Sequence, residues 1–233
     1  MTVVYLWSGG SGPQNLDERV SIEPNGALLL WRTVCGGRVG QFSLALGAQV
    51  GAEVAALAAE AASGEPVGGR FHPGQAEETV TIGDGVGGEI EDEDSAVMVT
   101  VAGGDQPGGP WGALLDRCRS HLHPSEAEPV AGVAISGDAT RLHLEHIGTE
   151  PFELCGPCVS VSVTSVDERM TGIASSSVDV TIDATATARV GWHLDLDVRH
   201  GLTPPAGGSL VAACLMQALV GGYPKQIAVS LPT

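Results

Sequence analysis

Four short apolar stretches with strand-like alternation open the chain, at 3–7, 19–23, 27–34 and 39–46. Pro24-Asn25-Gly26 separates the second stretch from the third, and because Asn and Gly tolerate positive φ, these two stretches predict a hairpin. Apolar residues then recur at helical spacing, at Val50, Val54, Leu57, Ala58 and Ala61. Ser63-Gly64 ends the predicted helix. We expect a β-meander with one helix packed on it, an α+β domain at 1–63 that buries both apolar surfaces.

A second, smaller unit is predicted at 64–125. Residues 64–78 are rich in Gly, Pro and charged residues, which is typical of a linker. Short strands follow at 79–82 and 97–101. A helix is predicted at 111–122, where apolar residues fall at 3.6-residue spacing: Trp111, Leu114, Leu115, Cys118 and Leu122. This small ββα unit is interpreted either as a degenerate repeat of the first domain or as an unrelated element, because only the order of elements is shared.

From residue 129 onward the pattern indicates strands separated by turns. The seven stretches are 130–135, 141–146, 152–163, 178–182, 186–198, 210–219 and 226–231. About seven strands in about 100 residues are typical of an immunoglobulin-like β-sandwich, so we expect an all-β domain at 129–233. The apolar run at 210–220 is equally compatible with a buried helix, since periodicity does not decide a short apolar run.

The net charge narrows the classes of partner. The chain carries 28 acidic and 11 basic residues, a formal charge of −17. Because such a surface repels phosphate backbones, we expect no binding to nucleic acid. The charge serves either solubility or the recognition of a basic partner.

Compartment and membrane association follow from what the sequence lacks. The N-terminal MTVVYLWSGG has neither the basic region nor the long apolar stretch of a signal peptide. No run approaches the roughly 18 apolar residues of a membrane helix. An odd number of cysteines, five, without an export signal favours reduced thiols. We therefore expect a cytoplasmic protein that does not bind a membrane.

Cys155-Gly-Pro-Cys158 resembles the thioredoxin motif, which needs its first Cys at a helix N-terminus. Here an alternating strand pattern follows, and Leu154 stands where the motif has Trp. As zinc ligands, the two thiolates would take His146 or His143, but these two histidines face opposite sides of a predicted strand, and a structural site needs four ligands. Cys155, Cys158 and His146 are thus weak candidates for a metal or for a metal-dependent enzyme, and the simpler interpretation is a turn carrying two thiols.

Other motifs in the sequence do not indicate an enzymatic activity. Gly83–Gly88 fits GxGxxG, but the acidic run Glu89–Asp94 follows where a phosphate-binding helix should begin. That run lacks the spacing of a calcium loop and is interpreted as a solvated charge cluster. No GxSxG, HExxH or Walker motif occurs. We expect no catalytic residues and no cofactor.

One family resemblance rests on residues 5–58. The strand VVYLWSGG, the hairpin DERVSIEPNGALLLWRT, the strand FSLAL and a helix ending in AALAA resemble the emfourin-like domains, which are related to an inhibitor of protealysin-type (M4) metallopeptidases. The resemblance implies a β-sheet with one packed helix, a cytoplasmic location and no catalytic residues. Emfourin-like domains are short chains, whereas this one continues for more than 100 residues beyond the match.

Two classes of function remain. The first is a non-enzymatic protein-binding module, in its narrower form an inhibitor of a metallopeptidase, and the second is a structural or assembly subunit. For the first, the Gly-rich loop after the first strand is the candidate contact surface. Its residues are Trp7, Ser8, Gly9, Gly10, Ser11, Gly12 and Asn15. Trp7 and Trp31 are interpreted either as interface anchors or as core residues.

Overall fold

Antiparallel β-sheet makes up most of the chain, and two α-helices accompany it in the part that the computed structural model describes. The structure describes residues 1–9, 16–32, 38–64, 76–86, 89–90, 95–102, 107–122, 124–169, 171–181, 185–220 and 223–231. Contacts divide the chain into two units. Unit 1 comprises Met1–Trp31 and Gln41–Glu128, and unit 2 comprises Arg32–Gly40 and Pro129–Thr233. Neither described helix is long and apolar enough to cross a bilayer.

The sheet of unit 1 has its first strand in the middle. The strand order is β4-β3-β2-β1-β5-β8. The strands are β1 (Thr2–Gly9), β2 (Leu16–Ile22), β3 (Ala27–Arg32), β4 (Arg38–Ala45), β5 (Glu77–Gly83) and β8 (Val97–Ala102). The predicted hairpin joins β2 to β3, and Gly26 adopts a φ of 83° in its turn. A separate two-stranded ladder pairs β6 (Gly85–Val86) with β7 (Glu89–Ile90).

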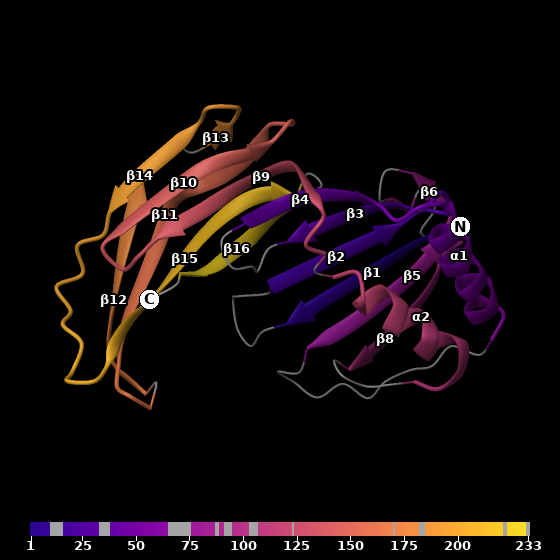
Figure 1. Ribbon diagram of the computed structural model, residues 1–233, viewed down its shortest axis with the longest axis horizontal. Helices are drawn as coiled ribbons and strands as arrows, with labels where there is room; N and C mark the ends of the chain where they lie inside the picture. Colours follow the sequence, from indigo (N-terminus) through magenta and orange to yellow (C-terminus); the bar gives the residue numbers. More distant parts are fainter. Residues whose placement is uncertain are drawn as a thin grey trace. The chain divides into compact units, whose positions relative to one another are not determined.

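Both helices lie side by side and cover one face of this sheet (Figure 1). They are α1 (Ala48–Ala62) and α2 (Gly109–Arg119). Most residues that the helical spacing predicts are buried, namely Val54, Ala58, Ala61, Trp111, Leu114, Leu115 and Cys118. Val50 and Leu57 are only half-buried, and Leu122 lies beyond the end of α2. Arg119 of α2 contacts Glu78 of β5. The side chain of Glu78 lies on the same face of the sheet as Tyr5 and as Val20 and Val80, which pair with Tyr5 on the adjacent strands. This is therefore the helix-covered face.

The pairing of β1 with β5 differs from the predicted domain boundary at residue 63. The ladder runs from the pair Thr2–Gly83 to the pair Ser8–Glu77, so elements predicted as a separate ββα unit complete the first sheet. A four-stranded meander would leave one edge of β1 without backbone partners, and β5 supplies them. Local periodicity carries no information about this pairing between segments about 80 residues apart.

Unit 2 contains strands of two antiparallel sheets, and apart from Arg32–Gly40 it begins at Pro129, where the strand-rich region is predicted. One has the order β14-β10-β9, and the other has the order β12-β11-β15-β16, with β13 also paired to β11. Their bounds are β9 (Glu128–Gly137), β10 (Arg141–Gly148), β11 (Phe152–Val166), β12 (Gly172–Thr181), β13 (Thr185–Ala188), β14 (His193–Asp197), β15 (Ser209–Val220) and β16 (Tyr223–Leu231). The single strand predicted at 186–198 is instead two strands, because Trp192 donates its backbone N–H to Arg189 O in a turn at 2.7 Å.

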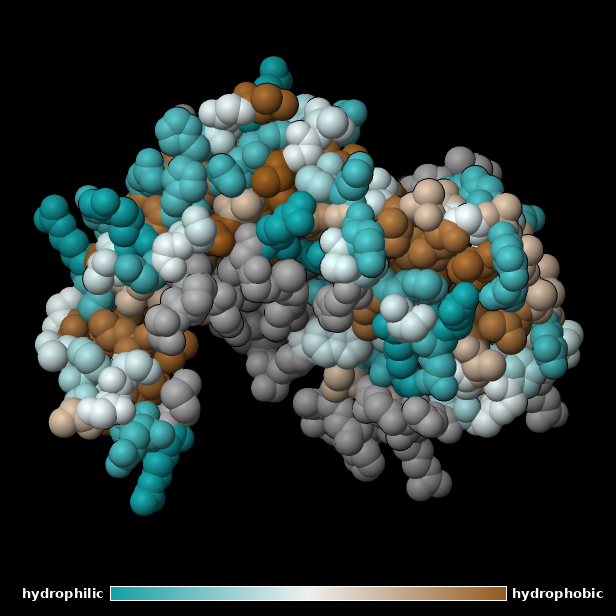
Figure 2. Space-filling model, in the orientation of Figure 1, coloured by the Kyte–Doolittle hydropathy of each residue, from teal (hydrophilic) through white to brown (hydrophobic). Residues whose placement is uncertain are grey.

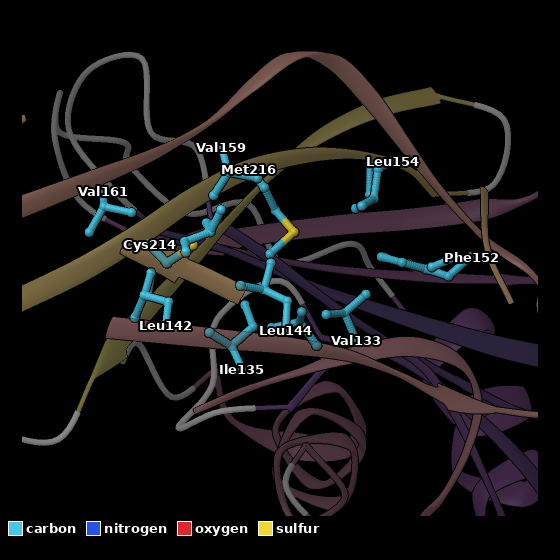
Figure 3. Packing of buried hydrophobic residues seen from close by; sticks show 14 of the residues in the cluster. Val133, Ile135, Leu142, Leu144, Phe152, Leu154, Val159, Val161, Cys214 and Met216 are labelled. Carbon is cyan, nitrogen blue, oxygen red and sulfur yellow. The ribbon is translucent and has the colours of Figure 1, made fainter. Parts of the chain in front are cut away.

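One hydrophobic core lies between these two sheets (Figure 3). Val133, Ile135, Leu142 and Leu144 face it from β9 and β10, and Met216 reaches toward them from β15. The alternative left open for 210–220 is thereby decided in favour of a strand. Every second residue of β15 is buried, namely Ala212, Cys214, Met216 and Ala218, which is the period of two that a strand requires.

Candidate functional site

An open pocket of about 570 Å³ lies in unit 1. Three neighbouring strands, β2, β3 and β4, line it together with the segment that follows α2. Half of the lining residues are apolar, namely Ala27, Leu28, Leu29, Leu44 and Ala45. The pocket thus has the size of a ligand site and combines apolar with polar residues in its wall.

Ser21 is a polar residue in the wall of this pocket, and its hydroxyl is buried. Val20 and Ile22 are buried on the helix-covered face, so Ser21 between them projects from the opposite face of the sheet. Its exposed fraction is only 2%, and its Oγ has no hydrogen-bond partner among the described residues. A buried hydroxyl in this state costs about 1–3 kcal/mol. A second hydroxyl, that of Ser43, is half-buried in the same wall.

Three glutamates add negative charge to the pocket. Glu126 and Glu128 are exposed, and both come from the segment after α2. Glu23 is half-buried at the end of the β2–β3 hairpin and accepts a hydrogen bond from Asn25 Nδ2 at 3.3 Å. Carboxylates beside an apolar wall produce a stronger field than carboxylates surrounded by water. This arrangement attracts a cation that also carries an apolar stem.

The predicted contact surface at the end of β1 is described only in part. Trp7 and Ser8 are half-buried, and Gly9 is buried. A Cβ at Gly9 would lie 2.4 Å from Trp7 Cη2, so glycine at this position leaves room for the indole ring. Trp7 lies opposite Glu18 and Glu78 on the two adjacent strands, toward the helix-covered face. The other predicted residues, Gly10, Ser11, Gly12 and Asn15, lie outside the described residues.

A buried polar network stands on the helix-covered face. Tyr5 Oη donates to Glu78 Oε2 at 3.1 Å, and Arg119 Nε contacts the same oxygen at 2.7 Å. Burial, with the neighbouring Glu78 carboxylate, raises the pKa of Tyr5 well above its usual range. Burial also raises the pKa of Cys118 to about 12, so its thiol stays protonated at neutral pH. These groups fix α2 to the sheet, and the network supplies no nucleophile.

The Cys155–Cys158 segment is part of strand β11, which corrects the interpretation as a turn. Cys155 pairs with Thr185 and Cys158 with Thr181, and the register with β15 shifts between Cys155 and Ser160. The two cysteines thus flank an irregularity in the pairing with β15. They still lie inside a strand, because Cys155 pairs with β13 and Cys158 pairs with β12. Burial raises the pKa of Cys155, the opposite of what a thioredoxin nucleophile needs. The side chain of Cys158 is not among those described.

The two histidines considered as ligands have other partners. His146 Nε2 lies 2.9 Å from Glu150 O, and His143 Nδ1 lies 2.8 Å from Asp195 Oδ1. Within the described ranges, no group of three His, Cys, Asp or Glu side chains is arranged to hold a metal ion. The GxGxxG stretch enters the β6–β7 ladder and not a helix. Of the acidic run after it, residues 91–94 lie outside the description.

A charged ladder occupies the exposed face of β10 and β14, where Figure 2 shows hydrophilic side chains in teal. Its cross-strand pairs are Arg141 with Asp197, His143 with Asp195, and Glu145 with His193. The His143 and His193 rings stack with centroids 6.1 Å apart. The hydrogen bond to Asp195 raises the pKa of His143, and the same bond lowers that of Asp195. The ladder joins β14 to its neighbour.

Sequence reasoning did not identify the pocket. Ser21 sits in an alternating strand where any outward residue is expected to be polar, and Glu126 and Glu128 are two of 28 acidic residues. No local signal distinguishes them, because the pocket exists only once the segment after α2 lies near β3 and β4. Searches of protein-family models, of curated proteins and of solved structures return no match to this chain.

Proposed function

We propose that this chain is a non-enzymatic protein-binding module whose contact surface includes the pocket of unit 1. The observation that carries this proposal is the combination of an apolar wall, flanking glutamates and an unpaired buried hydroxyl at Ser21. Together they present a hydroxyl and carboxylates that a polar side chain of a bound partner can contact. The net charge of −17 favours a basic protein over nucleic acid as that partner.

The narrower form of the proposal is a cytoplasmic inhibitor of a protealysin-type metallopeptidase. It rests on the resemblance of residues 5–58 to emfourin-like domains. The central position of β1 and the packing of α1 support it, because both belong to one compact unit. Trp7, at the end of β1, adds a half-buried aromatic side chain of the kind that anchors interfaces.

Mixing the purified chain with an M4-type peptidase tests this narrower form. We expect a stoichiometric loss of peptidase activity on a fluorogenic peptide and a complex that co-elutes from a sizing column. A serine peptidase that cleaves the same peptide is the control. Full activity together with separate elution of the two proteins would contradict the proposal.

An assembly subunit is the second candidate, and two edge strands favour it. Met98 on β8 is 64% exposed and Ile173 on β12 is 60% exposed, and both strands end their sheets. Apolar side chains on such edges fit the addition of a partner strand. The two-sheet core of unit 2 supports an immunoglobulin-like sandwich, an architecture shared by many protein-binding domains.

Tagged chain purified from its native host tests the assembly role. We expect one partner in stoichiometric amount, which the substitution Ile173→Glu or Met98→Glu releases. The matched control is Glu60→Gln, an exposed change on α1 that should leave the complex intact. A monomer with no stoichiometric partner argues against this candidate.

A further inference from the structure

We propose that the pocket of unit 1 binds an arginine side chain presented by the partner protein. This inference rests on the proposed protein-binding function and names the group that the pocket recognises. It draws on three features of the wall, namely its hydroxyls, its apolar residues and its carboxylates. Each feature matches one part of an arginine side chain.

The Ser21 hydroxyl is a group in the pocket wall to which a ligand can form a hydrogen bond. It is almost fully buried, its Oγ has no partner among the described residues, and it lines the pocket. A ligand with several N–H groups can satisfy this oxygen and also contact Ser43 in the same wall. Guanidinium carries five N–H donors in a fixed planar arrangement.

The apolar wall and the glutamates select the rest of the ligand. Leu29 offers surface to the methylene stem of a long side chain, while its charged head reaches the carboxylates. Glu126 and Glu128 are exposed and accessible to such a head. Arginine fits better than lysine, because guanidinium is more weakly hydrated and binds carboxylates with two parallel hydrogen bonds.

Other ligand classes match the lining less well. The carboxylates repel phosphate and carboxylate ligands. Among the described residues the lining has no aromatic side chain, so a quaternary ammonium or a methylated lysine would lack the rings that recognise it. The pocket is also open to solvent, which suits a side chain attached to a larger body.

Titration calorimetry with the full chain tests the inference. The probe is the capped peptide acetyl-Leu-Arg-Leu-amide, and the comparison peptide replaces arginine by citrulline, which has nearly the same shape but no charge. We expect the arginine peptide to bind at least about tenfold more tightly, since hydrogen bonds between ionised groups are about twice as strong as neutral ones. The lysine peptide should fall between the two.

Pocket variants locate the binding. Glu126→Gln combined with Glu128→Gln should weaken binding of the arginine peptide by about tenfold, and Ser21→Ala by about threefold, the range of a net hydrogen bond. The matched control is Glu60→Gln combined with Glu153→Gln, two exposed glutamates outside the pocket. It changes the net charge by the same amount and should leave the affinity unchanged. Circular dichroism checks that each variant is folded.

Three results would overturn the inference: equal affinity for the citrulline peptide, no binding of the arginine peptide, or equal loss in the control variant. Repeating the peptidase and sizing experiments with the pocket variants separates it from the proposed function. A complex that forms equally well with the Glu126 and Glu128 variant leaves protein binding intact and removes the arginine pocket. Absence of any complex together with absence of peptide binding removes both.

Discussion

Glu78 and Ser21 are buried on opposite faces of the unit 1 sheet and differ in the partners that the described chain supplies. On the helix-covered face, Glu78 is buried, but it accepts a hydrogen bond from Tyr5 and forms an ion pair with Arg119. On the opposite face, Ser21 is buried to a similar degree and has no partner among the described residues. Native proteins rarely leave such groups unpaired. The difference teaches that the chain itself completes the polar contacts of Glu78, whereas for Ser21 we propose a ligand.

The largest effect is expected from removing the arginine of the covered face. Arg119→Ala should lower the free energy of unfolding by about 3–5 kcal/mol, because it leaves Glu78 charged and buried without its cation. The side chains of Arg119 and Glu78 are 22% and 5% exposed. Urea denaturation measures the change. Arg117→Ala, which removes the more exposed pair with Glu53 at 3.3 Å, is the control and should cost about 0–1 kcal/mol.

Alkaline pH should weaken the same network through Tyr5. Its pKa is raised in the folded state, mainly by burial, so the unfolded chain loses this proton first as the pH rises through about 10. The contribution of Tyr5 to the stability is therefore complete below pH 10 and falls above it by up to about 1.4 kcal/mol per pH unit. Denaturation midpoints measured between pH 9 and pH 11 give this slope, because this range spans the ordinary tyrosine pKa of about 10. An unchanged slope in Tyr5→Phe would contradict the assignment.

Two serine substitutions should have opposite signs. Ser21→Ala should raise the free energy of unfolding by about 1 kcal/mol, because it removes an unpaired buried hydroxyl. Ser165 is equally buried, but its Oγ donates to Thr203 O at 3.4 Å. Ser165→Ala should therefore lower the stability by about 1 kcal/mol. Thermal denaturation of both variants gives the comparison, and a loss of stability in Ser21→Ala would indicate that its hydroxyl is already satisfied.

The smallest effect is expected from the charged ladder of β10 and β14, because its side chains are exposed, whereas Glu78 and Ser21 are buried. The pKa of His143 is raised by Asp195, so its contribution is complete below its ordinary pKa and is lost as the pH rises through the folded value. The pKa of Asp195 is lowered, so the same pair weakens again when strong acid protonates that carboxylate. A small decrease in thermal stability between mildly acidic and mildly alkaline buffer should disappear in Asp195→Asn.

Local pattern predicts the elements of this protein better than their partners. The turn at Pro24-Asn25-Gly26 has positive φ at Gly26, as its residue types indicate, and both predicted helices form and bury most of the expected apolar residues. The mostly antiparallel β architecture also follows from alternation. Only the structure decided that the apolar run of β15 is a strand, because the pattern of a short apolar segment is compatible with both a buried helix and a buried strand.

The sequence by itself determined both helices, the β2–β3 turn and most of the strands, since these depend on φ preferences and on the spacing of apolar residues along a few neighbouring positions. Only the tertiary structure decided that β5 pairs with β1, that Cys155 and Cys158 lie in a strand, and that Ser21 and Glu126 share one pocket. These relations join residues far apart in the chain. They arise from the closing of one sheet and the packing of one segment, and such long-range contacts leave no periodic trace in the sequence.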